Sequence, residues 1–151
     1  MPQSLCRIHL HLVFSTRNRI PYLKNKTVRI QLHSYLAGIN KNLGSTTMLI
    51  NGVEDHVHIL CLQPKMVCIA DHIRTLKTNS STWAKRQGAD YSKFAWQAGY
   101  GAFSVSESNV QKARQYIADQ EKHHNKKSFK QEYRELLKKH NIDYDERYVW
   151  D

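Results

Sequence analysis

The segment GVEDHVHILCLQP, residues 52–64, constrains the fold of this chain more than any other stretch. Successive side chains of a β-strand point to opposite faces, so residues two apart share a face. Val57 and Ile59 then lie on one face, while His56 and His58 lie together on the other. The pattern predicts a strand that buries an apolar face and presents two imidazoles on the opposite side.

The remaining elements follow from apolar periodicity and from glycine and proline punctuation. Alternation predicts strands at 5–16, 45–53, 55–63 and 94–106, and helical spacing predicts helices at 25–44, 66–88, from about 107 to 124, and 128–141. Either Ser104 with Glu107 or Ser106 with Asn109 can cap the third helix. The tail, 142–151, has no assignable pattern.

The order of these elements is strand, helix, strand, strand, helix, strand, followed by further helices. This is the order of the split βαβ, ferredoxin-like fold. Neither an internal repeat nor a Pro/Gly-rich linker divides the chain, so residues 1–151 are expected to form one domain. The predicted class is α+β, an antiparallel ferredoxin-like sheet with added C-terminal helices.

The charge of the chain favours a polyanionic partner. Lys and Arg number 23 against 13 Asp and Glu, a net charge of +10 in 151 residues. A small domain this basic usually binds nucleic acid. No stretch pairs a basic face with a strongly apolar one, and no apolar run approaches the roughly 18 residues that span a bilayer, so a membrane role is not expected.

The N-terminus and the cysteines predict a cytoplasmic protein. Arg7, His9 and His11 interrupt the first apolar stretch, which therefore lacks the arrangement of a signal peptide. Three cysteines without a C-x-x-C pair are expected to be reduced thiols, two of them in the core; they are Cys6, Cys61 and Cys68.

Two histidines at i and i+2 on a strand can chelate one divalent ion, although solvated or hydrogen-bonded imidazoles give the same pattern. His9 and His11 repeat the spacing on the first predicted strand. A third ligand is offered by the third helix, where Tyr116 and Gln120 are four residues apart and share a face. The alternative is that this helix packs Tyr116 into the core and leaves Gln120 solvated.

Together these motifs resemble those of the HUH-type single-tyrosine transposases of short bacterial and archaeal insertion sequences. The resemblance covers nearly the whole chain and rests on five blocks: HLVFSTRNR (11–19), GVEDHVHILCLQP (52–64), IRTLKTNSSTW (73–83), WQAGYGAFSVSESN (96–109) and YIADQEKHH (116–124). No motif position is missing, so an intact enzyme is expected. His9 matches no role in the family.

The resemblance implies that Tyr116 attacks a DNA phosphodiester and that His56, His58 and Gln120 bind Mg²⁺ or Mn²⁺. The product would be a 5′-phosphotyrosine with a free 3′-OH, an intermediate for excising and inserting a mobile element. The residue types agree with this chemistry. A phenol with a pKa of about 10 is a weak nucleophile, and a divalent ion can stabilise the leaving oxygen.

The resemblance also implies a single-stranded DNA substrate, with hairpins at the element ends, and a homodimer whose tyrosine helix can complete the partner's histidine pair. The predicted DNA-binding residues are Arg17, Arg19, Lys24, Arg74, Lys77, Lys85 and Arg86. Interleaved aromatic residues could stack on bases or pack in the core; they are Trp83, Trp96, Tyr100 and Phe103, with the core favoured for Phe103. A DNA substrate would place the protein in the cytoplasm, at the nucleoid.

Two other functions remain open. One is a domesticated relative that binds palindromic repeats without mobilising itself. The other is a non-catalytic RNA- or single-stranded-DNA-binding module, because the element order suits an RNA-recognition motif and GYGAFSV (99–105) faintly matches its aromatic signature. Ala102 stands where that signature has an aromatic residue, and the block lies in the wrong strand.

Overall fold

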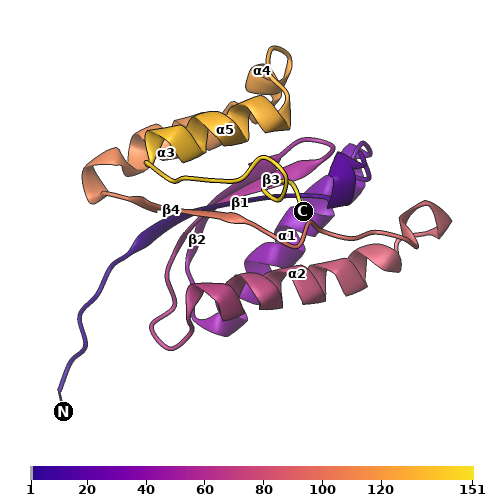
Figure 1. Ribbon diagram of the computed structural model, residues 1–151. Helices are drawn as coiled ribbons and strands as arrows, with labels where there is room; N and C mark the ends of the chain where they lie inside the picture. Colours follow the sequence, from indigo (N-terminus) through magenta and orange to yellow (C-terminus); the bar gives the residue numbers. More distant parts are fainter. Residues whose placement is uncertain (1) are drawn as a thin grey trace.

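A computed structural model describes residues 2–151 as one four-stranded sheet between two layers of helices (Figure 1). The elements are β1 (His9–Ser15), η1 (Arg17–Arg19), α1 (Lys26–Leu43), β2 (Thr47–Gly52), β3 (His56–Leu62), α2 (Ile69–Lys85), η2 (Ala89–Tyr91), β4 (Gly101–Val105), η3 (Glu107–Asn109), α3 (Val110–Ala118), α4 (Gln120–His124) and α5 (Phe129–Lys139). The strand order is β2-β3-β1-β4 and the paired strands are antiparallel. The predicted ferredoxin-like α+β class is confirmed.

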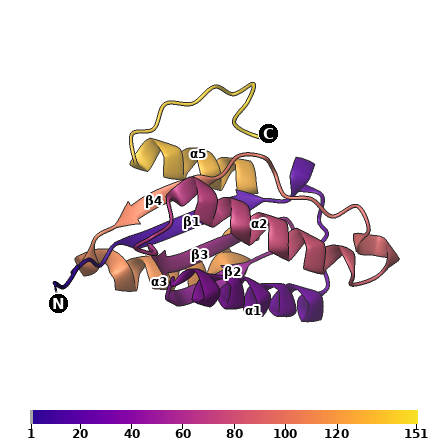
Figure 2. The same cartoon turned by 90° about the horizontal axis from the view of Figure 1, so that it is seen from below.

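The main apolar core lies between the sheet and the pair α1 and α2, which cross in front of the strands in Figure 2. Alternation explains how the strands contribute to it, since every second residue faces these helices. Phe14 of β1 and Ile59 of β3 are fully buried there against Leu36 of α1 and Leu76 of α2. This layer fixes which residues of β1 and β3 face the other way.

The second layer, formed by α3, α4 and α5, covers the face of the sheet that carries the histidines (Figure 1). Val13 and Phe103 pack on the apolar side of α5, and Leu60 packs on α3. His56 and His58 are therefore fully buried rather than set on an open strand face. The added helices, not solvent, form the surroundings of the imidazole pair.

The helix ends follow the chemistry of their sequences. Asn25 accepts a hydrogen bond from the Val28 amide at the start of α1, and Gly44 ends the helix in the left-handed conformation, with φ 81°. Ser128 and Gln131 form a capping box at the start of α5. These signals place α1 and α5 close to their predicted ranges.

The strand predicted at 94–106 is wrong in its first half, because only Gly101–Val105 forms a strand. Trp96 still forms an isolated bridge with Thr16, just beyond β1. The Lys77 ammonium accounts for the break between this bridge and β4. It donates hydrogen bonds to the carbonyls of Gln97, Ala98 and Gly99 at 2.8, 3.2 and 2.6 Å, which takes these carbonyls out of any ladder. A side chain on α2 thus holds this segment in an irregular path.

The third predicted helix is interrupted near Asp119, which separates α3 from α4. The Asn51 amide, at the end of β2, donates to the carbonyls of Ile117 and Ala118 at 2.9 and 3.1 Å. These bonds satisfy carbonyls that the end of α3 leaves unpaired. Neither predicted cap forms, because α3 starts after η3 without a side-chain cap.

The tail beyond α5 returns along that helix (Figure 1, yellow). Val149 and Trp150 pack against the α5 cluster, and the Asp151 carbonyl accepts a hydrogen bond from the Gly99 amide at 2.8 Å. Within residues 2–151, no helix combines the length and the apolar character that a membrane crossing requires.

The expectation of two buried cysteines is wrong. Cys61 is buried on the α1 and α2 side of β3, whereas Cys6 and Cys68 are exposed. Both exposed residues lie outside the helices and strands, where no apolar layer covers them.

Candidate active site

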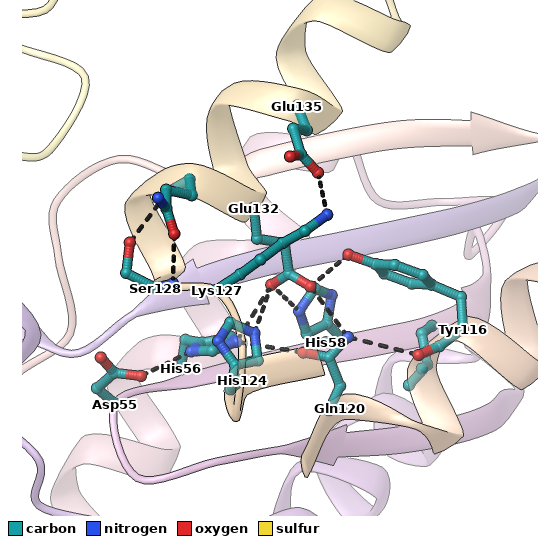
Figure 3. Close-up of polar contacts among 12 residues, drawn as sticks. Asp55, His56, His58, Tyr116, Gln120, His124, Lys127, Ser128, Glu132 and Glu135 are labelled. Atoms are coloured by element: carbon teal, nitrogen blue, oxygen red, sulfur yellow. Dashed lines mark hydrogen bonds and ion pairs between the residues drawn. The ribbon is translucent and has the colours of Figure 1, made fainter. Parts of the chain in front are cut away.

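The centre of the site is the pair His56 and His58 on β3 (Figure 3). Their Nδ1 atoms are held by neighbouring side chains: Asp55 Oδ1 lies 2.7 Å from His56 Nδ1, and His11 Nε2 lies 2.8 Å from His58 Nδ1. Because one ring nitrogen is held in each case, the other, Nε2, is directed at a common point. His11, which had no firm role from the sequence, orients His58.

Gln120 and Tyr116 reach the same point from α4 and α3. Gln120 is fully buried, and its Oε1 lies 3.3 Å from His56 Nε2. The Tyr116 ring lies edge-on to the His58 ring, with centroids 5.9 Å apart. The structure therefore brings the four residues of the predicted metal and nucleophile set together within one chain.

Sequence reasoning missed Glu132, a residue of α5 that is 2% exposed and lies at the middle of the cluster (Figure 3). Its Oε1 lies 2.9 Å from His58 Nε2 and 3.3 Å from His56 Nε2. The same oxygen lies 3.0 Å from Nε2 of His124, which sequence reasoning also missed as a site residue.

The other carboxylate oxygen of Glu132 contacts the helices that carry Tyr116 and Gln120. Glu132 Oε2 accepts hydrogen bonds from the Tyr116 hydroxyl and, at 3.1 Å, from Gln120 Nε2. A signal for Glu132 was present in the sequence: it lies at helical spacing between Phe129 and Leu136, on the apolar face of α5. An acidic residue on such a face needs a partner when it is buried.

The electrostatics of the cluster depend on Glu132. Burial would raise the pKa of its carboxyl, but hydrogen bonds with His124, His56 and His58 hold that pKa well below its usual range. Burial lowers the pKa of His56, while the bonds to Asp55 and Glu132 more than compensate and raise it to about 9. The cluster is thus a buried anion surrounded by imidazoles.

The neighbouring groups respond in opposite directions. Burial lowers the pKa of His58 despite its bond to Glu132. Burial and the negative charge of Glu132 raise the pKa of the Tyr116 phenol above its ordinary value of 10.0. The Tyr116 phenol therefore stays protonated at neutral pH unless a positive charge at the site compensates for the burial and for Glu132.

A cavity of about 610 Å³ opens beside Tyr116, between the end of β4 and α5. It is lined in part by Ser106, Asn109, Lys112 and Lys139. The hydroxyl, amide and ammonium groups can bind phosphate oxygens. Tyr116 and Glu132 line the same cavity.

The predicted DNA-binding residues fall into two groups. Arg17, Arg19 and Lys24 lie in the segment after β1. Lys24 lines a second cavity with Arg29 and His124, next to the histidine cluster.

The second group lies on α2 or at its end, in the layer opposite Tyr116; it comprises Arg74, Lys77, Lys85 and Arg86. The structure does not bring this group to the site. Arg74 is exposed beside Asp71, whereas burial lowers the pKa of Lys77 to about 8, and its ammonium is engaged by backbone carbonyls.

The structure separates the two alternatives, base stacking and core packing, for the interleaved aromatic residues. Trp96 is 7% exposed, and its indole N–H donates to Ser80 Oγ at 2.9 Å, so Trp96 follows the core-packing alternative. Phe103 is buried, as favoured from the sequence. Trp83 stacks on Tyr35 of α1, with centroids 5.6 Å apart, and Tyr100 is exposed.

Solved structures with a similar fold include a candidate transposase of Deinococcus radiodurans R1. It has a TM-score of 0.62 and 22% identity over 80% of this chain and 95% of that chain. A REP-associated tyrosine transposase bound to a REP hairpin has a TM-score of 0.53 and 12% identity, over 78% of this chain and 67% of that chain. No curated protein sequence matches the chain significantly.

The family comparison covers the strands, the histidine pair and the tyrosine helix. A family model described as "Transposase IS200 like" matches residues 4–120, which end at Gln120. This match agrees with the resemblance of the sequence motifs and with the fold of the two solved structures. The chain belongs to the IS200-like transposase family.

Proposed function

We propose that this protein is a metal-dependent transposase of single-stranded DNA that uses Tyr116 as its nucleophile. The observation that carries the proposal is the meeting of Tyr116 and Gln120 with His56 and His58 in one buried cluster, beside a cavity with basic residues. Metal-assisted cleavage by a tyrosine combines a nucleophile, metal donors and phosphate-binding groups in this way.

The donor set fits a divalent cation. Two imidazole nitrogens and an amide oxygen come from His56, His58 and Gln120. Because the Nδ1 atoms of both histidines are held, each Nε2 points into the site, where it contacts Glu132 and, for His56, also Gln120. When bound, Mg²⁺ or Mn²⁺ would withdraw charge from the scissile phosphate and stabilise the departing oxygen. Glu132 Oε1 lies within 2.9 Å of His58 Nε2 and is close enough to take part.

The residues supply the remaining parts of the reaction. The Tyr116 oxygen attacks phosphorus, the bond from phosphorus to the 3′ oxygen breaks, and a 5′-phosphotyrosine forms. The phenol loses one proton and the departing 3′ oxygen gains one, so charge and atoms balance. Lys112 and Lys139 line the adjoining cavity and can hold the flanking phosphates. Rejoining reverses the same exchange and needs no nucleotide cofactor.

The proposed substrate is DNA with hairpins at the ends of a mobile element. One structural neighbour was solved with a REP hairpin, which supports this choice of substrate. The basic groups on η1 and α2 are candidates for duplex or hairpin contacts away from the cleavage site. Such a substrate places the protein in the cytoplasm, at the nucleoid.

A homodimer is part of the proposal. Excision cuts two DNA ends, each covalent intermediate occupies one tyrosine, and Tyr116 is the single candidate nucleophile of the chain. Two chains related by a two-fold axis supply two tyrosines. Light scattering at working concentration tests the dimer, and a fully active monomer would refute it.

The RNA-recognition alternative is disfavoured by the coverage of the sheet. That module stacks bases on an exposed sheet face. Here α1 and α2 cover one face, and α3 to α5 cover the other (Figures 1 and 2). Phe103, from the motif that resembled the RNA-recognition signature, is 2% exposed and cannot stack on a base.

Covalent trapping tests the proposed function. The full chain is mixed with single-stranded DNA containing the palindromic repeats beside its own gene, with Mn²⁺ or Mg²⁺. We expect a denaturation-resistant adduct for the natural protein and for Tyr148→Phe, a control at an exposed tyrosine of the tail. Tyr116→Phe should bind the DNA without an adduct. Tight hairpin binding with no adduct by the natural protein would favour the domesticated repeat-binding relative.

A further inference from the structure

The helix α5 lies outside the stretch that matches the family, which ends at residue 120, yet it contributes the most central residue of the site. Glu132 is 2% exposed, and both of its carboxylate oxygens have partners from other elements. Burying a carboxylate costs several kcal/mol unless charged or hydrogen-bonding groups compensate. Its position is better explained by a role at this site than by packing.

Four donor residues converge on one point. His56, His58, His124 and Glu132 each offer one ligand atom, and these atoms all lie within 4.8 Å of one another. Three are imidazole Nε2 atoms, and the fourth is the carboxylate oxygen that they surround. A convergence of this kind, of side chains from three separate elements that are buried or, for His124, partly buried, is typical of a cation site.

The carboxylate changes the chemistry of the site. His56, His58 and Gln120 alone offer neutral donors when the imidazoles are deprotonated, and carboxylate oxygens suit Mg²⁺ and Mn²⁺ better than nitrogen ligands do. Glu132 adds a full negative charge, and His124 adds another nitrogen donor. With Oε2 on the Tyr116 hydroxyl, the same carboxylate also holds the nucleophile beside the donors.

We propose that Glu132 and His124 are ligands of the divalent cation, so that the C-terminal helix completes the metal centre begun by His56 and His58. The inference rests on the proposed function, because it concerns the cation at that same site. It makes the docking of α5 and the binding of metal mutually dependent: the metal stabilises the docked helix, and the helix supplies its anionic ligand.

The test measures Mn²⁺ affinity on the full-length protein, by titration calorimetry and by electron paramagnetic resonance of free Mn²⁺. Glu132→Gln keeps the shape but removes the charge, and His124→Ala removes one nitrogen. We expect each change to weaken Mn²⁺ binding at least about tenfold, as loss of even an outer partner does at other metal sites. Glu135→Gln, on the same helix but paired outward with Lys127, should bind as the natural protein does.

A second readout follows the thermal midpoint. Mn²⁺ should raise the midpoint of the natural protein and of Glu135→Gln, and should raise it less for Glu132→Gln and His124→Ala. Circular dichroism in EDTA checks that the variants fold. If Glu132→Gln fails to fold, His124→Ala decides the question by the same tenfold criterion.

The outcomes separate this inference from the proposed function. Unchanged Mn²⁺ affinity in Glu132→Gln would overturn it, and so would tighter binding, which would mean that the carboxylate occupies the place of the cation. Failure of the natural protein to bind Mn²⁺ would also overturn it. If Glu132→Gln and His124→Ala leave Mn²⁺ affinity unchanged and still form the Tyr116 adduct, this inference fails and the proposed function is retained. If the natural protein binds Mn²⁺ in a Glu132-dependent way but forms no DNA adduct, the inference about the metal centre is retained and the proposed transposase chemistry is refuted.

Discussion

The hydroxyl of Tyr116 donates a hydrogen bond to the carboxylate of Glu132, and this contact joins α3 to the C-terminal helix α5. It holds the phenol beside the histidine pair, where burial and then the negative charge of Glu132 raise the pKa of the phenol. In the absence of metal, the contact therefore stabilises the fold and keeps the phenol of Tyr116 protonated.

Tyr116→Phe should destabilise the metal-free protein. The phenylalanine keeps the ring and removes the donor to a charged acceptor, a bond of about 1.5–3 kcal/mol. Because Glu132 Oε2 retains its bond from Gln120, we expect a loss near the lower value in urea unfolding with EDTA. An unchanged free energy of unfolding would show that the hydroxyl is not bound to Glu132 in solution.

His11→Ala should weaken metal binding, although His11 is not among the proposed ligands. Its Nε2 holds His58 Nδ1 at 2.8 Å, and loss of such an orienting partner costs about 10–100-fold in metal affinity. His9→Gln is the matched control, because His9 lies at the start of the same strand beside Glu107. Equal Mn²⁺ affinities for the two variants would contradict an orienting role for His11.

Removal of the metal should stop cleavage. We expect EDTA, His56→Ala and His58→Ala each to abolish the DNA adduct, because the leaving oxygen then lacks stabilisation. We also expect the free energy of unfolding of both alanine variants to fall by about 1–3 kcal/mol, since each substitution removes a buried partner of Glu132. Cleavage is measured on denaturing gels and stability by urea unfolding. Undiminished cleavage in EDTA would remove the metal from the mechanism.

Mixing inactive chains should not restore cleavage. The structure places Tyr116, His56 and His58 in one chain, although the family resemblance allows the tyrosine helix to complete the partner's histidine pair. We therefore expect Tyr116→Phe mixed with His56→Ala to stay inactive under conditions of subunit exchange. Differently tagged chains verify that mixed dimers form. Recovery of partial cleavage would show that α3 crosses to the partner during the reaction.

Alkylation should distinguish the three thiols. Iodoacetamide should modify the exposed Cys6 and Cys68 at pH 8 but leave Cys61 unmodified. Burial raises the pKa of Cys61 to about 11, so moving to pH 9 still leaves its reactive thiolate scarce. Mass spectrometry of the modified peptides gives the result, and unfolding in urea should expose the third thiol. Rapid labelling of Cys61 in the folded protein would contradict its burial.

Local sequence patterns determined the element order, because alternation and capping act over a few residues. Alternation alone placed His56 and His58 on the face opposite Val57, and helical spacing placed Gln120 on the face of Tyr116. Gly44 and the box at Ser128 set helix ends through their own backbone and side-chain chemistry. These features needed no knowledge of distant neighbours.

The tertiary structure alone decided which side chains complete the site, because the deciding contacts join residues far apart in the chain. Glu132 contacts His58 although the two lie 74 residues apart in the chain, and His11 contacts His58 although those two lie 47 residues apart. The end of α3 and the irregular path before β4 depend in the same way on Asn51 and Lys77, whose partners lie on other elements. Local periodicity carries no information about such long-range contacts, since they form only when the helices pack on the sheet.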